Sequence, residues 1–387
     1  MKLGRRTFTA GLAASLASAG LGLGARPAAA QPYRGPNVII IRFGGGVRRR
    51  ETIDRTHTFA PFLRHELTKK GILIPDMRIA SLQGVETSHA EGTLNILAGR
   101  YLAYRNLGTG FPAQHLEPTA PTLFEYLRKA YRIPAHRALL INGEDRPQEE
   151  FFTFGVHRHY GIAYRSETLS LYRFKLHKFR RQLERSEGTD EELAEAQKQL
   201  DELLRHDHRK LGPRQTPPVE AFWSRWQRYF GKSGFVNPRG DRLLTELAIR
   251  ALKELRPRLM MVNYQDPDYV HWGNPSHYTR AVAVIDQELR RLVNAVELDE
   301  EYRDQTVFVI VPDCGRDSNP LMDVPFQHHF NTRSAHEIWA LIFGPGIARG
   351  KTLDKVKDQT TIAATVGAIM GFRARRAEGD VLEEIFV

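Results

Sequence analysis

The chain has 387 residues, of which 41% are hydrophobic and 26% charged, and its formal net charge is +11. This is an ordinary globular composition with length enough for a large core, in one α/β domain with insertions or in two domains. The single cysteine, Cys314, excludes an internal disulfide. A basic surface suits nucleic acid, an anionic envelope or an anionic substrate, but the run Arg48-Arg49-Arg50 alone is weak support for nucleic-acid binding.

The first thirty residues are typical of an export signal. Lys2 and the pair Arg5-Arg6 precede an apolar, Gly/Ala-rich stretch from Ala10 to Ala25, and three alanines end at Ala30. The arginine pair resembles a twin-arginine signal. A membrane anchor is the alternative, but the stretch is too short and too rich in glycine, because about 20 apolar residues are needed to span a bilayer. We expect removal of residues 1–30, a mature net charge of +7, and a soluble periplasmic or secreted protein without a membrane span.

Strand-like apolar runs alternate with helical patterns along the rest of the chain. The predicted strands are 37–43, 78–85, 137–143, 259–265, 306–313 and 338–346, and the predicted helices are 59–70, 92–101, 122–130 and 278–296. This alternation favours an α/β fold in which helices sandwich a mostly parallel sheet. The β-branched run 38–41 is typical of a buried parallel strand, and it ends at three glycines, 44–46, where ligands of such sheets collect.

The middle of the chain differs in composition. Residues 165–235 are rich in Arg, Glu, Lys and Leu and predict two amphipathic helices joined near Gly188. We interpret this segment as a helical insertion within the α/β domain of residues 31–387. It is either a solvated arm or a hairpin that binds a protein partner.

Three groups of potential metal ligands lie beside predicted strands. Their carboxylate, imidazole and thiol side chains are all competent zinc ligands: Asp266, Asp268 and His271; Asp313 and Cys314; and His328 and His329. Each group by itself also fits an ordinary turn, a buried thiol or a surface histidine. His336 is a spare candidate that fits a surface histidine better.

The order of these groups resembles the alkaline phosphatase superfamily, which includes sulfatases, nucleotide phosphodiesterases and cofactor-independent phosphoglycerate mutases. Its members have a strand ending in Asp-Gly, a Ser, Thr or Cys nucleophile, an Asp…His pair, Asp-His-Gly after a strand, and a lone His before the last strand. In this chain "LNILAGRY", "DPDYVHWG", "VIVPDCGRD" and "WALIFGPGI" resemble successive parts of that pattern. The resemblance spans most of residues 37–347 and implies an alkaline-phosphatase-like fold and a two-metal hydrolase of phosphate or sulfate esters.

Three positions depart from the family pattern, and all belong to one half of the expected site. Gly45 stands where the family has a metal-binding Asp, His89 where it has the nucleophile, and Cys314 where it has a His. The other half keeps its ligand types, supplied by Asp266 or Asp268, His271, and His328 or His329.

The departures leave three hypotheses open. In the first, His89, Asp313 and Cys314 rebuild a zinc site, and Thr87, Ser88 or a water attacks the ester. In the second, a single metal remains in an altered hydrolase. In the third, the domain is catalytically degenerate and binds an anionic ligand or a protein partner without turnover.

Charged residues nearby complete the prediction. Glu51, Glu86 or Glu91 could replace the missing carboxylate, and Arg48 and Arg316 are candidates for binding an anionic group through bidentate hydrogen bonds. We therefore predict an exported hydrolase of a small phosphate or sulfate ester, with one or two divalent ions, zinc being the first candidate. The catalytic candidates are Thr87, Ser88 and His89, and no nucleic-acid partner is expected.

Overall fold

The computed structural model describes residues 32–106, 116–143, 160–205, 207, 214–231, 240–271, 275–318, 327–328 and 332–387. The predicted export signal and His329 lie outside the described residues. Within the described part of the chain, no helix combines the length and the apolar character that crossing a membrane requires.

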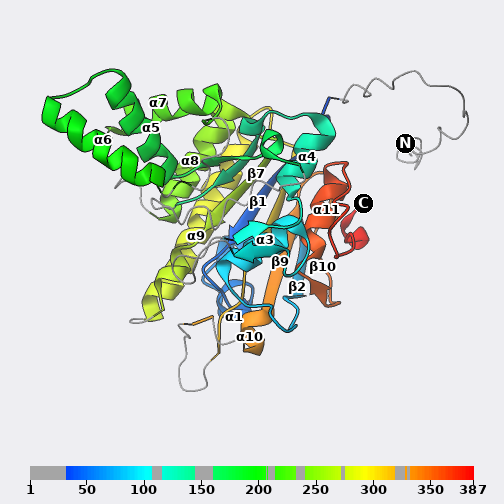
Figure 1. The fold of residues 1–387 in the computed structure, drawn as a ribbon. Helices are drawn as coiled ribbons and strands as arrows, with labels where there is room; N and C mark the ends of the chain where they lie inside the picture. Colours follow the sequence, from blue (N-terminus) through cyan, green and yellow to red (C-terminus); the bar gives the residue numbers. More distant parts are fainter. Residues whose placement is uncertain are drawn as a thin grey trace, which may run out of the picture. The chain divides into compact units, whose positions relative to one another are not determined.

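A nine-stranded sheet forms the centre of the fold (Figure 1). The strand order is β10-β2-β9-β8-β1-β7-β5-β6, and β11 pairs with β2 beyond this path. Every pairing in this sheet is parallel except those of β9, which runs antiparallel to β2 and β8. The strands are β1 (Asn37–Phe43), β2 (Gly71–Arg78), β5 (Ala138–Ile141), β6 (Glu167–Leu169), β7 (Leu259–Tyr264), β8 (Thr306–Val311), β9 (Glu337–Phe343), β10 (Lys351–Thr352) and β11 (Lys357–Asp358). A separate antiparallel pair consists of β3 (Tyr104–Asn106) and β4 (Leu116–Pro118).

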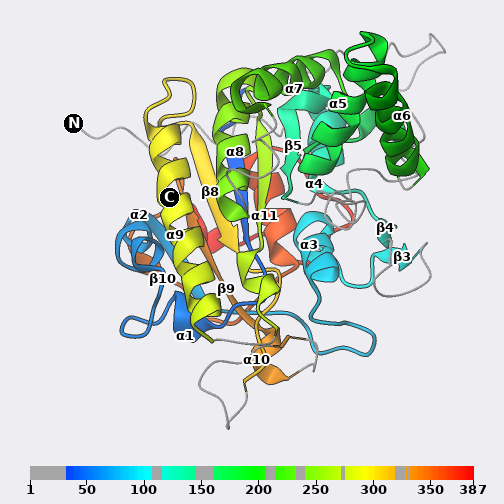
Figure 2. The ribbon, with the colours of Figure 1, turned by 90° about the vertical axis from the view of Figure 1, so that its left-hand side faces the viewer.

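Helices cover both faces of the sheet, and Figure 2 shows α8 and α9 lying across one of them. That face carries α7 (Pro217–Phe230), α8 (Asp241–Leu255) and α9 (Pro275–Glu297), and the other carries α3 (His89–Ala98), α4 (Leu123–Tyr131) and α11 (Thr361–Ile369). The shorter helices are α1 (Arg49–Thr52), η1 (Phe62–Leu67), α2 (Thr68–Lys70), η2 (Ala135–Arg137), η4 (Ile162–Tyr164), η6 (Asp266–Tyr269), α10 (Arg333–His336) and η7 (Glu383–Ile385).

The continuous apolar run of β1 follows from this sandwich. Ile39, Ile41 and Phe43 join the hydrophobic cluster under α8 and α9, whereas Val38 and Ile40 join the cluster under α3, α4 and α11. Successive side chains of a strand point to opposite faces, so a strand buried on both faces has apolar residues at consecutive positions. The predicted α/β fold with a mostly parallel sheet is confirmed.

One predicted strand is wrong in position. The sequence predicted residues 78–85, but the strand is β2, at Gly71–Arg78. β2 pairs antiparallel with β9, and its register shifts between Ile74 and Met77. Pro75 lies at this shift, where a residue without a backbone N–H is tolerated. The charged and proline positions of the irregular strand obscured its apolar pattern, and residues 79–88 instead lead into α3.

The range 165–235 contains structure of two kinds. α5 (Leu171–Glu184) and α6 (Asp190–Arg205) flank Gly188 as predicted and share a small apolar cluster of their own. In contrast, β6 pairs with β5 in the main sheet, and α7 places Trp223 and Trp226 in the main core. The interpretation of this range as an insertion, and as a partner-binding arm, stays a prediction.

Candidate metal centre

The chemistry-bearing residues gather at the carboxyl ends of three neighbouring strands. β1 lies between β7 and β8 and is parallel to both, so the three strands end at the same edge of the sheet. η6 follows β7, Asp313 and Cys314 follow β8, and the three glycines follow β1. In open α/β sheets this edge is where ligands bind.

The three glycines leave room for the two flanking loops. A Cβ atom at Gly45 would collide with the backbone nitrogen of Asp268, and one at Gly46 would lie 2.9 Å from the carbonyl oxygen of Gly315. Both glycines also have positive φ, +86° and +68°, which residues with a Cβ adopt at a cost. The place of the family's aspartate is therefore filled by the backbone of the Asp268 loop.

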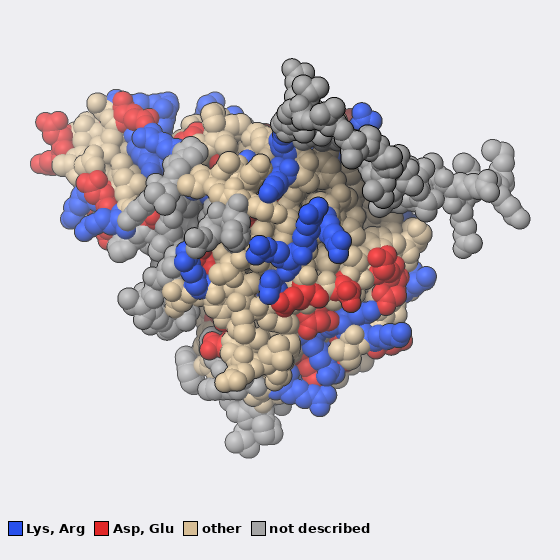
Figure 3. All heavy atoms as spheres, turned by 45° about the vertical axis from the view of Figure 1, so that its right-hand side comes forward, with Lys and Arg blue, Asp and Glu red and all other residues tan. Residues whose placement is uncertain are grey.

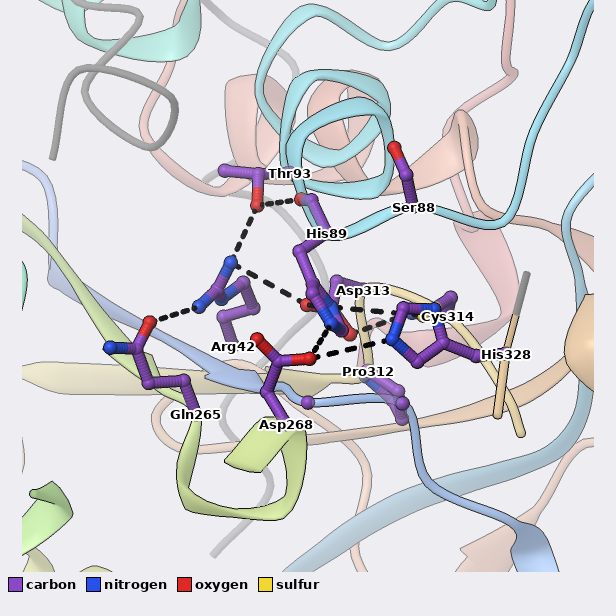
Figure 4. A network of polar contacts seen from close by, with 12 residues as sticks. Arg42, Ser88, His89, Thr93, Gln265, Asp268, Pro312, Asp313, Cys314 and His328 are labelled. Atoms are coloured by element: carbon purple, nitrogen blue, oxygen red, sulfur yellow. Dashed lines mark hydrogen bonds and ion pairs between the residues drawn. The ribbon is translucent and has the colours of Figure 1, made fainter. Parts of the chain in front are cut away.

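Three histidines converge on one carboxylate oxygen. Oδ1 of Asp268 lies 2.6 Å from Nε2 of His89 and 3.4 Å from Nε2 of His328 (Figure 4). The same oxygen lies 2.9 Å from Nε2 of His271. His89 begins α3, whose N-cap Ser88 accepts a hydrogen bond from the backbone N–H of Glu91. The convergence therefore joins an α-helix start, a 3₁₀ turn and a loop that lie far apart in the sequence.

The other ring nitrogen of each histidine faces an acceptor. Nδ1 of His89 lies 2.8 Å from Oδ2 of Asp313, and Nδ1 of His271 lies 3.1 Å from Oε1 of Gln327. Nδ1 of His328 lies 3.1 Å from the carbonyl oxygen of Thr87. Each Nδ1 therefore faces a group that can accept its proton, and a neutral ring protonated at Nδ1 would direct its Nε2 lone pair toward Asp268.

Electrostatics favour a cation among these groups. If all three Nε2 contacts were hydrogen bonds, each ring would be a doubly protonated imidazolium, and three positive charges would surround one carboxylate. A divalent ion between them would let the rings stay neutral, and three imidazole nitrogens with one carboxylate are a known zinc donor set. The residues present therefore fit a metal ion. An acceptor on the far nitrogen of each ring is also the usual way in which proteins orient metal-binding histidines.

The charges of the cluster shift its pKa values strongly. Burial lowers the pKa of His89, but the negative charges of Asp268 and Asp313 outweigh it and hold the pKa well above its usual value. Burial raises the pKa of Asp268, but without a metal ion the charge of His89 and hydrogen bonds from His271 and His328 hold it far below its usual range. Both carboxylates that contact His89 are thus ionised, as metal ligation and ligand orientation require.

Exposure gives the cluster one open side. The side chain of Asp268 is 37% exposed and that of His271 is 26% exposed, whereas those of Asp313 and His328 are fully buried. A small molecule can therefore reach the cluster from the side of Asp268 and His271.

A second group of side chains lies behind His89. Cys314 Sγ is 3.9 Å from Nδ1 of His89, and Nη1 of Arg42 is 3.4 Å from Oδ2 of Asp313. Burial, and then the charge of Asp313, raise the pKa of the Cys314 thiol to about 12. Burial raises the pKa of Asp313, but His89 and Arg42 outweigh it and lower the pKa below its usual value.

Several predicted site residues have other contacts. The carboxylate of Asp266 accepts a hydrogen bond from the backbone N–H of Asp241, so of the two aspartates in η6 it is Asp268 that meets the histidines. The Thr87 hydroxyl is buried and donates to the carbonyl oxygen of His328 at 2.5 Å. Ser88 caps α3, and Figure 4 shows its hydroxyl directed away from the cluster.

The two predicted anion-binding arginines hold the protein's own groups. Arg316 is fully buried, lies over the ring of Tyr278, and donates to the carbonyl oxygens of Gly45, Gly46, Pro267 and Val270. Arg48 pairs with Glu51 through two hydrogen bonds of 2.8 and 2.5 Å. Arg316 thus joins the loops after β1 and β7, and its buried position does not suit the predicted contact with substrate.

The predicted replacement carboxylates are also engaged or exposed. Glu51 is held by Arg48, and Glu91 contacts Ser88 and the Tyr104 hydroxyl. Burial, and then the charge of Glu86, raise the pKa of Glu91 to about 7. Glu86 itself is exposed.

Sequence reasoning missed Arg42 and Gln327. Arg42 is a charged residue in an otherwise apolar strand that is buried on both faces, and that anomaly was a usable signal. Gln327 precedes the predicted ligand His328, but nothing in its local sequence indicates a contact with His271.

Comparisons with known proteins agree with this arrangement. The family model described as the Metalloenzyme superfamily matches residues 233–374, which include Asp268, His271, Asp313 and His328. Among solved structures, a protein in the alkaline phosphatase superfamily from Vibrio parahaemolyticus aligns with 93% of this chain and 72% of its own, at 14% identity and a TM-score of 0.56. The resemblance to the alkaline phosphatase and sulfatase superfamily is confirmed.

Two further solved structures have a similar fold. The lipoteichoic acid synthase LtaP from Listeria monocytogenes is 10% identical, with a TM-score of 0.51 over 90% of this chain and 74% of that one. A 2-O GAG sulfatase is 12% identical, with a TM-score of 0.54 over 90% and 73%. The sequence matches no curated protein. The match to a metalloenzyme model, together with the ligand cluster at His89, indicates a divalent metal.

Proposed function

We propose that this protein is an exported, metal-dependent hydrolase of a phosphate or sulfate ester. The observation that carries the proposal is the convergence of three imidazole Nε2 atoms on Oδ1 of Asp268. His89, His271, His328 and Asp268 would hold the ion, with zinc the first candidate from the donor types. When bound, such an ion supplies Lewis acidity that polarises an ester oxygen and stabilises the negative charge developing on it.

The protein's own groups would orient the ligands and leave attack to water. Asp313, Gln327 and the carbonyl of Thr87 accept the Nδ1 protons and so fix the three rings. The Thr87 hydroxyl is buried and engaged, and Ser88 caps a helix, so neither is presented as a nucleophile. We therefore favour attack by water over formation of a covalent intermediate on a side chain.

An anionic ester suits the open side of the cluster. A cation held there would attract a phosphate or sulfate group, and the excess of basic residues in the chain would raise the local concentration of anions. On the face seen in Figure 3, basic side chains gather over the middle, and acidic side chains lie beside them. This mixture, among the atoms described on that face, favours a small anionic substrate over nucleic acid.

Export and partners are further parts of the proposal. Residues 1–30 have the composition of a twin-arginine type signal, which supports a periplasmic or secreted location. The pair α5–α6 has its own small core and exposes most of α6, which makes it the candidate surface for a protein partner.

Hydrolysis of simple esters tests the proposal. The protein lacking residues 1–30 is assayed with 4-nitrophenyl phosphate, bis(4-nitrophenyl) phosphate and 4-nitrophenyl sulfate, after removal of metal and after addition of zinc, manganese or calcium. We expect metal-dependent hydrolysis of at least one of these three esters. His271→Ala should lower kcat/KM by about 100-fold or more. His277→Ala, at an exposed position of α9, is the matched control and should leave the rate unchanged.

The hydroxyls of Thr87 and Ser88 are already hydrogen-bonded within the protein, and Gly45 stands where the family has a metal-binding aspartate. These two features also favour the second candidate function, a domain that binds an anion without turnover. Metal-dependent binding of phosphate or sulfate, without hydrolysis of any of the three esters, would support that candidate and contradict the hydrolase.

A further inference from the structure

The buried carboxylate of Asp313 is already satisfied by the protein. Its Oδ1 accepts the backbone N–H of Cys314 at 2.8 Å. Its Oδ2 lies 2.8 Å from Nδ1 of His89 and 3.4 Å from Nη1 of Arg42. Both oxygens of this carboxylate therefore have partners, and one of those partners is a permanent cation.

Arg42 is held firmly in this position. It projects from β1 and is fully buried, and Nη1 donates to Oγ1 of Thr93 at 3.1 Å. Nη2 lies 3.5 Å from Oε1 of Gln265 (Figure 4). It also lies 3.5 Å from the carbonyl oxygen of Tyr264. A guanidinium group cannot lose its proton in a protein, so a fixed positive charge stands beside Asp313.

His89 can serve only one ion. Among the residues that the structure describes, two groups of three side chains have donor atoms close enough to share a metal: His89, Asp268 and His328, and His89, Asp313 and Cys314. Both need His89, but a neutral imidazole has a single lone pair for a metal. When the neutral ring keeps its proton on Nδ1 and donates it to Asp313, the lone pair is on Nε2, which lies 2.6 Å from Oδ1 of Asp268.

We infer that this site takes one divalent ion rather than two, that His89 at the nucleophile position is a ligand of that ion, and that the guanidinium of Arg42 replaces the second. The inference rests on the proposed metal-dependent function and deepens it. All three departures from the family pattern then have one cause. Gly45, His89 and Cys314 no longer serve a second metal, because Asp313 pairs with Arg42 and orients His89.

Metal stoichiometry tests the inference without reference to activity. The mature protein is loaded with excess Co²⁺ or Zn²⁺, freed of unbound metal, and its metal content is measured by inductively coupled plasma mass spectrometry. In parallel, the metal-free protein is titrated with each ion by calorimetry. We expect one equivalent per chain. The Co²⁺ absorption spectrum should lack a thiolate charge-transfer band and be the same in the conservative variant Cys314→Ser. Two equivalents per chain, or a charge-transfer band that Cys314→Ser abolishes, would overturn the inference.

The role of His89 is tested by metal affinity. His89→Ala should weaken Co²⁺ binding by about 100-fold, whereas His277→Ala should leave the affinity within about twofold. Circular dichroism of each variant checks that the fold is retained, and His89→Gln repeats the test with a side chain of similar size. Unchanged affinity in both folded His89 variants would contradict its role as a ligand.

The outcomes separate this inference from the proposed function. One equivalent of metal without ester hydrolysis supports the single-ion site and overturns the hydrolase. Hydrolysis with two equivalents does the reverse, and the absence of any metal binding overturns both.

Discussion

Replacing Gly45 by alanine tests whether the glycine run exists to admit the Asp268 loop. Two costs follow from the structure. A residue with a Cβ at φ +86° is strained by about 1–2 kcal/mol, and the new Cβ would collide with the backbone nitrogen of Asp268 and lie 2.9 Å from the carbonyl carbon of Pro267. Because these are backbone atoms, the loop must shift, which adds about 1–3 kcal/mol by analogy with overpacked cores.

Gly346→Ala is the matched control for this prediction. Gly346 has φ +76°, and nothing lies within 4 Å of the Cβ it would gain, so its substitution carries the strain without the collision. Thermal unfolding should place Gly45→Ala below Gly346→Ala by about 2–6 °C, at about 2 °C per kcal/mol for a domain of this size. Gly45→Ala should also weaken Co²⁺ binding, because Asp268 moves, whereas Gly346→Ala should not. Equal losses of stability and unchanged metal affinity in the two variants would refute the steric argument.

Three further predictions concern stability. Gly92→Ala in α3 should destabilise the protein by about 1–3 kcal/mol in urea unfolding, because the new Cβ would collide with the carbonyl oxygen of Asp313. Helix propensity alone would stabilise this variant by about 1 kcal/mol, so a stabilised variant would contradict the steric argument. Asp286→Ala should cost about 2 kcal/mol, since its carboxylate accepts two backbone N–H groups at the start of η1 at 2.9 and 2.8 Å, and a loss below about 0.5 kcal/mol would refute that role. The hydrogen bond from Arg78 lowers the pKa of Asp76, so the stability that the ionised Asp76 contributes is present above its unfolded-state pKa and is lost as the pH falls through the folded-state pKa. Asp76→Asn should therefore lower the free energy of unfolding by about 0.5 kcal/mol at neutral pH and by less at about pH 3. A loss of stability that grew on acidification would contradict this prediction.

The local hydrophobic pattern of the sequence was enough to predict most of the fold and the types of metal ligand. The apolar runs at 37–43, 259–265 and 306–313 predicted three strands, and all three are present as β1, β7 and β8. These predictions succeeded because a strand buried on both faces needs consecutive apolar residues wherever it lies in the sheet. The positions of Asp268 and Asp313 just after such strands then followed from the chain itself.

The choice between neighbouring candidates depended on tertiary contacts. Whether Asp266 or Asp268 faces the histidines is set by the direction of each side chain in a single 3₁₀ turn, and Asp266 is held by Asp241 on another helix. The strand at 71–78 was misplaced for a related reason, because pairing with β9 overcame an irregular local pattern.

The sequence alone determined which segments form the sheet and which residue types gather at its carboxyl edge, since hydrophobic periodicity is a local property. Only the tertiary structure decided that Arg42 stands beside Asp313, that His89 turns Nε2 toward Asp268, and that Gly45 makes room for a neighbouring loop. Each of these contacts joins residues more than 170 positions apart, and periodicity carries no information about which strand ends become neighbours.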